Sequence, residues 1–157
     1  SDRSGGSPQE VMRNALLACS KTAGYDAVVV LLDGDVKPAS CEDLYLTAKK
    51  HISLEARKKI PSIYACIVAN PCLEGLLLET KTGFPPPKVS EDCKRSFASN
   101  FGKAAQKLSK EDYRRLLPKT MIDQALPRIP ALNRLVTFFK LHGNDDSFCS
   151  WFNQPHS

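Results

Sequence analysis

Two carboxylates stand two residues apart where a run of apolar residues ends, in Asp33-Gly34-Asp35. Side chains two positions apart in an extended chain point the same way, so both carboxylates can face one spot. Gly34 lets the chain turn between them. Like charges this close repel each other, and a magnesium ion, which prefers oxygen ligands, removes that repulsion. The alternative is an ordinary turn after a strand, where Asp and Gly are common.

A second acidic position follows the next apolar run, in residues 70–74 (NPCLE). Asn70 and Pro71 are typical of a helix start, with Asn70 as the N-cap, which places Glu74 in the first helical turn. If the two apolar runs are neighbouring parallel strands, both acidic segments open on the edge where such sheets carry their sites. We therefore predict a site formed by Asp33, Asp35 and Glu74. The alternative for Glu74 is a carboxylate that only complements the helix dipole.

The elements that must position these carboxylates are two short apolar runs, residues 27–32 (AVVVLL) and 63–69 (IYACIVA). Such runs are typical of strands that are covered on both faces, as in a parallel sheet. Ser7 and Glu10 form a capping box that predicts a helix before the first run, and another amphipathic helix lies between the runs. The order helix–strand–helix–strand–helix predicts an α/β fold with a small parallel sheet and flanking helices.

A Pro-rich segment at residues 83–89 predicts a linker. Beyond it, Ser90 and the pair Ser109 and Asp112 predict helix starts, prolines separate short helices, and no strand pattern is present. We therefore predict an α/β domain over residues 1–82 and a helical subdomain over residues 90–157.

Positive charge is concentrated in this second part. The net charge of the chain is +5, but residues 94–140 carry 11 Lys and Arg against three acidic residues, a net of +8. Basic helices attract the phosphate groups of nucleic acids, and the candidate contacts are Lys94, Arg95, Arg114 and Arg115. The alternative is a solvated helical face or a patch for an acidic partner.

Residues 25–35 (YDAVVVLLDGD) and 67–74 (IVANPCLE), with a helix between them, resemble the RloB-like branch of the Toprim superfamily. In that branch a strand ends in D-x-D and a later strand leads to an S-N-P-x-x-E-like motif. Ala69 stands where that motif often has Ser. The resemblance covers residues 7–80 clearly, and it implies a Toprim-like sheet in the α/β part.

The same resemblance implies a magnesium-dependent nuclease, with Mn²⁺ as the alternative ion, that hydrolyses phosphodiester bonds of DNA or RNA. Relatives include anti-phage and restriction-linked proteins beside an ATPase partner protein. By position, Asp33 and Asp35 match the metal-binding D-x-D, and Glu74 matches the acidic residue after N-P. The Glu that the superfamily places on an earlier strand has no counterpart before Ser7. The rival interpretation is a catalytically degenerate module that binds a partner protein or nucleic acid, and nucleotidyl transfer is a third.

The composition of the chain excludes some classes of protein. With 42% apolar and 25% charged residues, the chain is not a mainly disordered one. No apolar run approaches the ~20 residues of a membrane span, and no signal peptide is evident, so we expect a cytoplasmic protein without a membrane partner. Six cysteines without C-x-x-C spacing predict reduced thiols.

Overall fold

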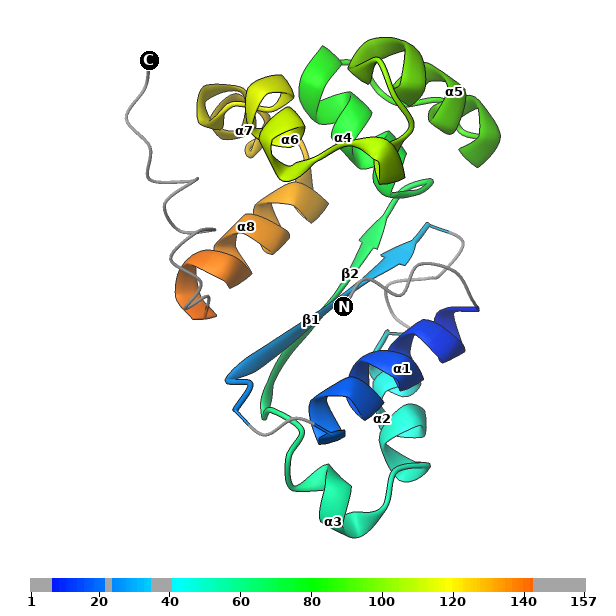
Figure 1. Ribbon diagram of the computed structural model, residues 1–157, viewed down its shortest axis with the longest axis vertical. Coiled ribbons are helices and arrows are strands. Elements are labelled where there is room, and N and C mark those ends of the chain that lie inside the picture. Colours follow the sequence, from blue (N-terminus) through cyan, green and yellow to red (C-terminus); the bar gives the residue numbers. More distant parts are fainter. Residues whose placement is uncertain (1–6, 22–23, 35–40, 143–157) are drawn as a thin grey trace. The chain divides into compact units, whose positions relative to one another are not determined.

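Apolar runs and helix caps divide the chain into short elements. The computed structural model describes residues 7–21, 24–34 and 41–142. In chain order the elements are α1 (Pro8–Lys21), β1 (Ala27–Asp33), α2 (Cys41–Lys50), α3 (Leu54–Arg57), β2 (Ile63–Ala69), α4 (Leu73–Thr82), α5 (Ser90–Phe101), the 3-10 turn η2 (Ala105–Lys107), α6 (Lys110–Leu116), α7 (Lys119–Ala125) and α8 (Pro130–His142) (Figure 1). None of the helices in the described ranges is both long and apolar enough to cross a membrane. With two strands among these helices, the described part of the chain is mixed α/β and mostly helical.

Both predicted strands are confirmed, and β2 has the predicted bounds. β1 and β2 are hydrogen-bonded neighbours in a parallel pair, and within the described residues the sheet consists of these two strands (Figure 1). A parallel pair needs a long crossover connection, and the helices α2 and α3 lie in the connection between these two strands. The carboxyl ends of β1 and β2 therefore lie at the same edge of the sheet.

The chain divides into two units, a first unit (Ser1–Val68) and a second unit (Ala69–Ser157). The first unit holds α1 to α3, β1 and all but the last residue of β2, and α4 and the later helices belong to the second unit. The predicted linker, residues 83–89, lies between α4 and α5, inside the second unit.

The first unit has one apolar core between its helices and one face of the sheet. α1 packs against α2 and β1, and the Tyr45 ring of α2 stacks on the Tyr64 ring of β2 with a centroid separation of 3.8 Å. Strand side chains alternate between faces, so Val30 and Leu32 reach this core while Asp33 belongs to the other face. The buried residues of the core are Met12, Leu16, Val30, Leu32, Cys41, Tyr45, Ala48, Ile52, Ile60 and Cys66.

The second unit has its own core, built by helices alone after Ala69. α4 packs against α5 and α7, and the rings of Phe97 and Phe101 stack with centroids 4.0 Å apart. The buried residues are Ala69, Leu76, Leu78, Phe97, Phe101, Leu117, Ile122, Ala125, Ile129, Leu132 and Val136. Full burial of one large apolar side chain contributes about 1.5–3 kcal/mol, so the aromatic pair is a major part of this core.

Two predicted helix starts are confirmed as capping boxes. The Ser7 N–H donates to Oε2 of Glu10 at 3.0 Å, and the Glu10 N–H donates to Oγ of Ser7 at 3.3 Å. Ser109 and Asp112 exchange the same two hydrogen bonds at the start of α6. In each case the side chains satisfy backbone N–H groups that have no partner inside the helix.

The prediction that Ser90 caps α5 is wrong. The N-cap is Val89, whose carbonyl oxygen accepts the first helical hydrogen bond, from the Cys93 N–H at 3.1 Å. Ser90 is therefore already a helical residue, and a cap side chain must precede the helix.

The cysteines agree with the predicted reduced state. The five within the described residues are reduced thiols and buried: Cys19, Cys41, Cys66, Cys72 and Cys93. Cys41 and Cys66 are small apolar members of the first core.

Candidate functional site

Asp33 is the last residue of β1 and is exposed to solvent. The strand alternation that buries Leu32 in the first core directs Asp33 to the opposite face, away from α1 and α2. Gly34 follows as a turn residue, and Asp35 lies outside the described residues. Asp33 is thus a solvent-accessible carboxylate at the edge predicted for the site.

The segment after β2 differs from the prediction in where α4 begins. The first helical hydrogen bond runs from the Leu76 N–H to the Cys72 carbonyl oxygen at 3.1 Å, so Cys72 is the N-cap. The prediction that Asn70 is the N-cap is therefore wrong, because the helix starts two residues later than such a cap requires. Asn70 is exposed and precedes a half-buried Pro71.

Glu74 lies in the first turn of α4, as predicted, and is half-buried. The charge of its carboxylate affects the pKa values of two neighbouring groups of the second unit, the Tyr113 hydroxyl and the Cys93 thiol. Burial raises the pKa of Tyr113, and the charge of Glu74 raises that pKa further. Burial is also the main reason that the pKa of the Cys93 thiol rises to about 11, with smaller contributions from Cys72 and Glu74. Both neighbours therefore stay protonated beside Glu74 at neutral pH.

The described residues do not test the predicted trio. Asp33 belongs to the first unit and Glu74 to the second, and their meeting at one edge stays a prediction. Across residues 7–21, 24–34 and 41–142, no group of three or more His, Cys, Asp or Glu side chains is placed to hold a metal ion. Asp35, the third member, is outside those ranges.

Lys94 and Arg95 on α5 are exposed, and each forms an ion pair with an acidic residue one helical turn earlier. Nζ of Lys94 lies 3.6 Å from Oε1 of Glu91, and the guanidinium of Arg95 pairs with the Asp92 carboxylate. Exposed pairs of this kind contribute about 0–1 kcal/mol, so a phosphate group can replace the carboxylate at little cost.

Arg114 and Arg115 on α6 follow the same pattern but differ in exposure. Nη1 of Arg114 lies 3.2 Å from Oε1 of Glu111, and Nη2 of Arg115 lies 3.6 Å from Oδ1 of Asp112. The Arg115 side chain is 69% exposed, whereas that of Arg114 is 26% exposed. Arg115 is therefore the better placed of the two to contact a phosphate backbone.

The first unit also contains a groove of about 540 Å³ between α1 and α2. Glu10, Arg13, Asp43 and His51 are among the residues that line it. His51 is exposed. The groove carries both signs of charge and contains none of the predicted site residues.

Sequence reasoning missed two pairs of neighbours in the second unit. Cys72 and Cys93 are neighbours whose interaction raises the pKa of the Cys93 thiol, and Sγ of Cys93 donates to the Pro87 carbonyl oxygen at 3.0 Å. Lys81 and Arg128 line one pocket although they are far apart in the chain. Neither pair has a spacing that signals contact, because each joins residues of different helices or loops.

The fold and these neighbours can also be compared with known proteins. No family model, no curated protein and no solved structure matches this chain.

Proposed function

We propose that the chain is a metal-dependent nuclease that hydrolyses phosphodiester bonds of nucleic acid. The parallel pairing of β1 and β2 supports this proposal more than any other observation. It makes the strand that ends in Asp33 and the strand that leads to Glu74 end at one edge of the sheet, where parallel sheets carry their sites.

The donor set suits magnesium. Asp33, Asp35 and Glu74 would supply carboxylate oxygens, which Mg²⁺ and Mn²⁺ prefer over nitrogen or sulfur. Asp33 is exposed, so solvent water can complete the coordination shell. When bound, the ion neutralises charge on the phosphate and orients a water molecule.

Residues of the second unit would hold the nucleic acid. Lys94, Arg95 and Arg115 are the exposed cations among the four candidates, and exchange of their own carboxylate partners for phosphate oxygens would fix the backbone. Their contacts position the strand without reading its sequence, because phosphate groups are the same at every step.

We further propose that the sheet is of the Toprim-like type and that the chain works beside an ATPase partner protein. The order β1, α2, β2, α4 supports the first point, since the D-G-D and N-P-C-L-E segments follow successive parallel strands. The rival function is a catalytically degenerate module that binds nucleic acid or a partner protein without cleaving it.

The test is a cleavage assay of the full chain on single-stranded and double-stranded DNA and RNA, with and without Mg²⁺. We expect cleavage only with the metal. Asp33→Asn, Asp35→Asn and Glu74→Gln should each lower the rate at least about a hundredfold, because a metal site contributes several kcal/mol to the transition state.

Matched controls separate the site from general effects of charge removal. Asp26→Asn removes an exposed carboxylate just before β1, and Glu79→Gln removes a half-buried one from α4 outside its first turn. Both should keep wild-type activity. Absence of cleavage by the wild type on every substrate, with nucleic-acid binding retained, would favour the degenerate binding module instead.

A further inference from the structure

A polar pocket of about 280 Å³ lies in the second unit, at the C-terminal end of α4 and beside α7. α4 contributes Lys81 and Thr82, the following residue is Gly83, and Thr120 comes from α7. Arg128, from the segment between α7 and α8, lines the same pocket. It is separate from the predicted metal ligands and from the four predicted nucleic-acid contacts.

The charged residues that line this pocket are all cationic. Lys81 and Arg128 are cationic, and the described residues that line the pocket include no Asp or Glu. Asp123, the acidic residue of α7, forms an ion pair with Lys119 instead. The pocket therefore favours an anion over a cation.

Arg128 is exposed and donates to two backbone carbonyl oxygens, with donors left over. Its Nη1 donates to the Gly83 carbonyl oxygen at 3.1 Å, and its Nε donates to the Gln124 carbonyl oxygen at 3.4 Å. A guanidinium has five N–H donors, so the second N–H of Nη1 and both of Nη2 have no acceptor among the described residues. These donors form the planar fork that binds a phosphate or carboxylate through two oxygens.

Gly83, whose carbonyl oxygen accepts from Arg128, ends α4. Its φ of +77° is in the left-handed region that favours glycine, and it ends α4 through a hydrogen bond from its N–H to the Glu79 carbonyl oxygen. A Cβ at this position would stand 3.4 Å from Nη1 and 3.9 Å from Nη2 of Arg128. These are ordinary contact distances, so it is the positive φ, and not a lack of space, that favours glycine here.

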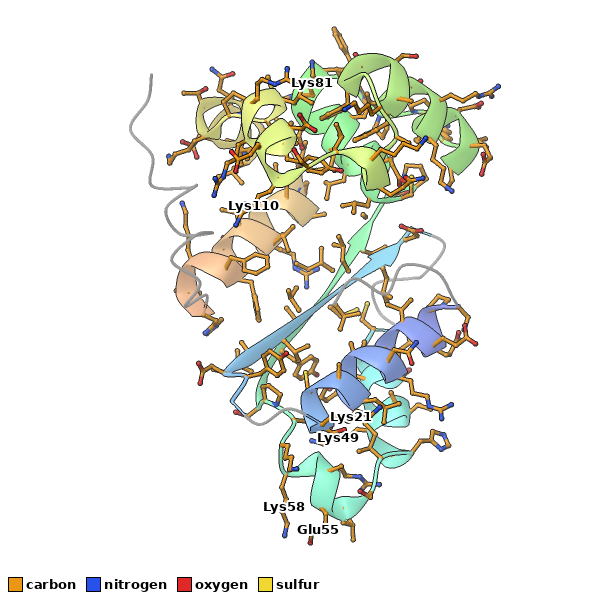
Figure 2. The ribbon with its side chains drawn as sticks, in the orientation of Figure 1. Lys21, Lys49, Glu55, Lys58, Lys81 and Lys110 are labelled. Atoms are coloured by element: carbon orange, nitrogen blue, oxygen red, sulfur yellow. The ribbon has the colours of Figure 1, made fainter. Side chains whose placement is uncertain are left out.

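Lys81 supplies the second cation from the last turn of α4 (Figure 2). It is half-buried, and its Nζ lies 5.7 Å from the centroid of the Phe101 ring. The hydroxyl of Thr82 accepts a hydrogen bond from the Phe84 N–H at 3.2 Å, so its own O–H remains a donor.

We propose that this pocket binds the oxyanion of a phosphate ester, held by the Arg128 fork, the Lys81 ammonium and the Thr82 hydroxyl. Its source is either a small phosphorylated molecule or a phosphate group of a nucleic-acid backbone. The negative end of the α4 dipole opposes an anion here, and the bond from Arg128 to the Gly83 carbonyl offsets that opposition. The proposal does not depend on the nuclease activity, because the pocket includes none of Asp33, Asp35 and Glu74.

The first experiment titrates the ¹⁵N-labelled full chain with inorganic phosphate, against sodium chloride at matched ionic strength. We expect saturable shifts of the Thr82, Gly83 and Thr120 amides and of the Arg128 Nε–H, with a Kd on the order of 1 mM. Shifts that do not saturate, or that sodium chloride reproduces, would overturn the proposal.

Substitutions of the lining residues test whether phosphate binds in this pocket. Lys81→Gln and Arg128→Gln should each weaken phosphate binding about tenfold, the value of one charge-assisted hydrogen bond. Lys107→Gln is the matched control, since it removes an exposed lysine outside the pocket, and it should bind like wild type. Arg128 also donates to the Gly83 carbonyl oxygen at the C-terminal end of α4, so its substitution can lower stability. The thermal midpoint of unfolding is therefore measured for each variant as well. Unchanged binding in Lys81→Gln contradicts the proposal even if Arg128→Gln fails to fold.

A final arm distinguishes the two sources. With a nucleic-acid backbone as ligand, a short single-stranded oligonucleotide shifts the same amides at lower concentration than phosphate does, and Lys81→Gln weakens that binding. With a small phosphorylated ligand, phosphate shifts these amides and the oligonucleotide does not. Failure of the nuclease assay leaves both results unchanged, because no metal or cleavage is involved.

Discussion

The two units of this chain reach stability by different means. The first unit covers one face of a parallel strand pair with two helices, and its core is largely aliphatic, with Tyr45 as its aromatic member. The second unit is built from short helices separated by prolines, and Phe97 and Phe101 stack at its centre. The acidic residue at the end of β1 and the basic helices thus belong to different units, whereas Glu74 belongs to the same unit as the basic helices.

The largest expected effect tests whether the two cores are energetically separate. Phe97→Ala removes a fully buried ring from the second core and should lower the free energy of unfolding by about 3–5 kcal/mol. Leu16→Ala, which truncates a fully buried side chain of the first core, should cost about 2–5 kcal/mol. Hydrogen exchange measures which amides lose protection in each variant.

In the Phe97 variant, amides of α4 and α5 should exchange faster while those of α1 and β1 keep their protection, and the Leu16 variant should show the reverse. Equal loss of protection throughout the chain in both variants would mean that one cooperative core spans the two units.

A smaller expected effect distinguishes the two units by how their stability depends on pH. Burial, and then the neighbouring Cys72 and Glu74, raise the pKa of the Cys93 thiol from 9.0 to about 11. The folded second unit therefore keeps a proton that the unfolded chain loses, so this contribution to stability is complete below pH 9 and is lost as the pH rises toward 11. Urea unfolding on either side of this window measures the loss.

Cys93→Ala is the control for that measurement, since it removes the titrating group but keeps a small apolar side chain. The fall in stability between pH 9 and 11 should be smaller in this variant than in wild type. The same fall in both proteins would assign it to other groups, such as Tyr113, whose pKa burial also raises.

The smallest effect concerns the helix caps. Ser109→Ala removes the capping box of α6 and should destabilise the second unit by about 1 kcal/mol, whereas Ser90→Ala should change stability little because Ser90 caps nothing. Thermal unfolding compares the two variants. Nearly equal losses would show that helix propensity, and not capping, decides these positions.

The stability that the capping box of α6 contributes also depends on pH. Hydrogen bonds from the backbone and side chain of Ser109 lower the pKa of Asp112, so the stability that this carboxylate adds is present at neutral pH and is lost as the pH falls into the acid range. In Ser109→Ala the pKa of Asp112 should rise toward its ordinary value, as an NMR pH titration of that side chain can measure.

Much of this fold could be predicted from sequence because its signals are local. The runs 27–32 and 63–69 predicted both strands, and the two Ser-x-x-acid patterns predicted the starts of α1 and α6. The two wrong caps, Asn70 and Ser90, have suitable cap chemistry at the wrong position. Which backbone carbonyl accepts the first helical bond depends on how the helix packs, and α4 packs against α5 and α7.

The candidate site was only partly accessible to such reasoning. Parallel pairing follows from the order of elements, so the edge that carries Asp33 could be predicted. The pocket around Arg128 could not, because Gly83 is 45 residues away from it and neither residue belongs to a motif. The bond between them depends on α4 packing against α7, a tertiary contact with no local signal.

Pairs of opposite charge one helical turn apart recur along this chain, on α5 and α6 and also on α3, where Glu55 lies 3.6 Å from Lys58 (Figure 2). Each of these cations already has a negative neighbour, so it disturbs the small ions of the solvent less than an isolated lysine would. When a polyanion takes the place of such a carboxylate, one bound charge is exchanged for another. The logarithm of the association constant should therefore fall less steeply with the logarithm of salt concentration than the number of lysines and arginines suggests.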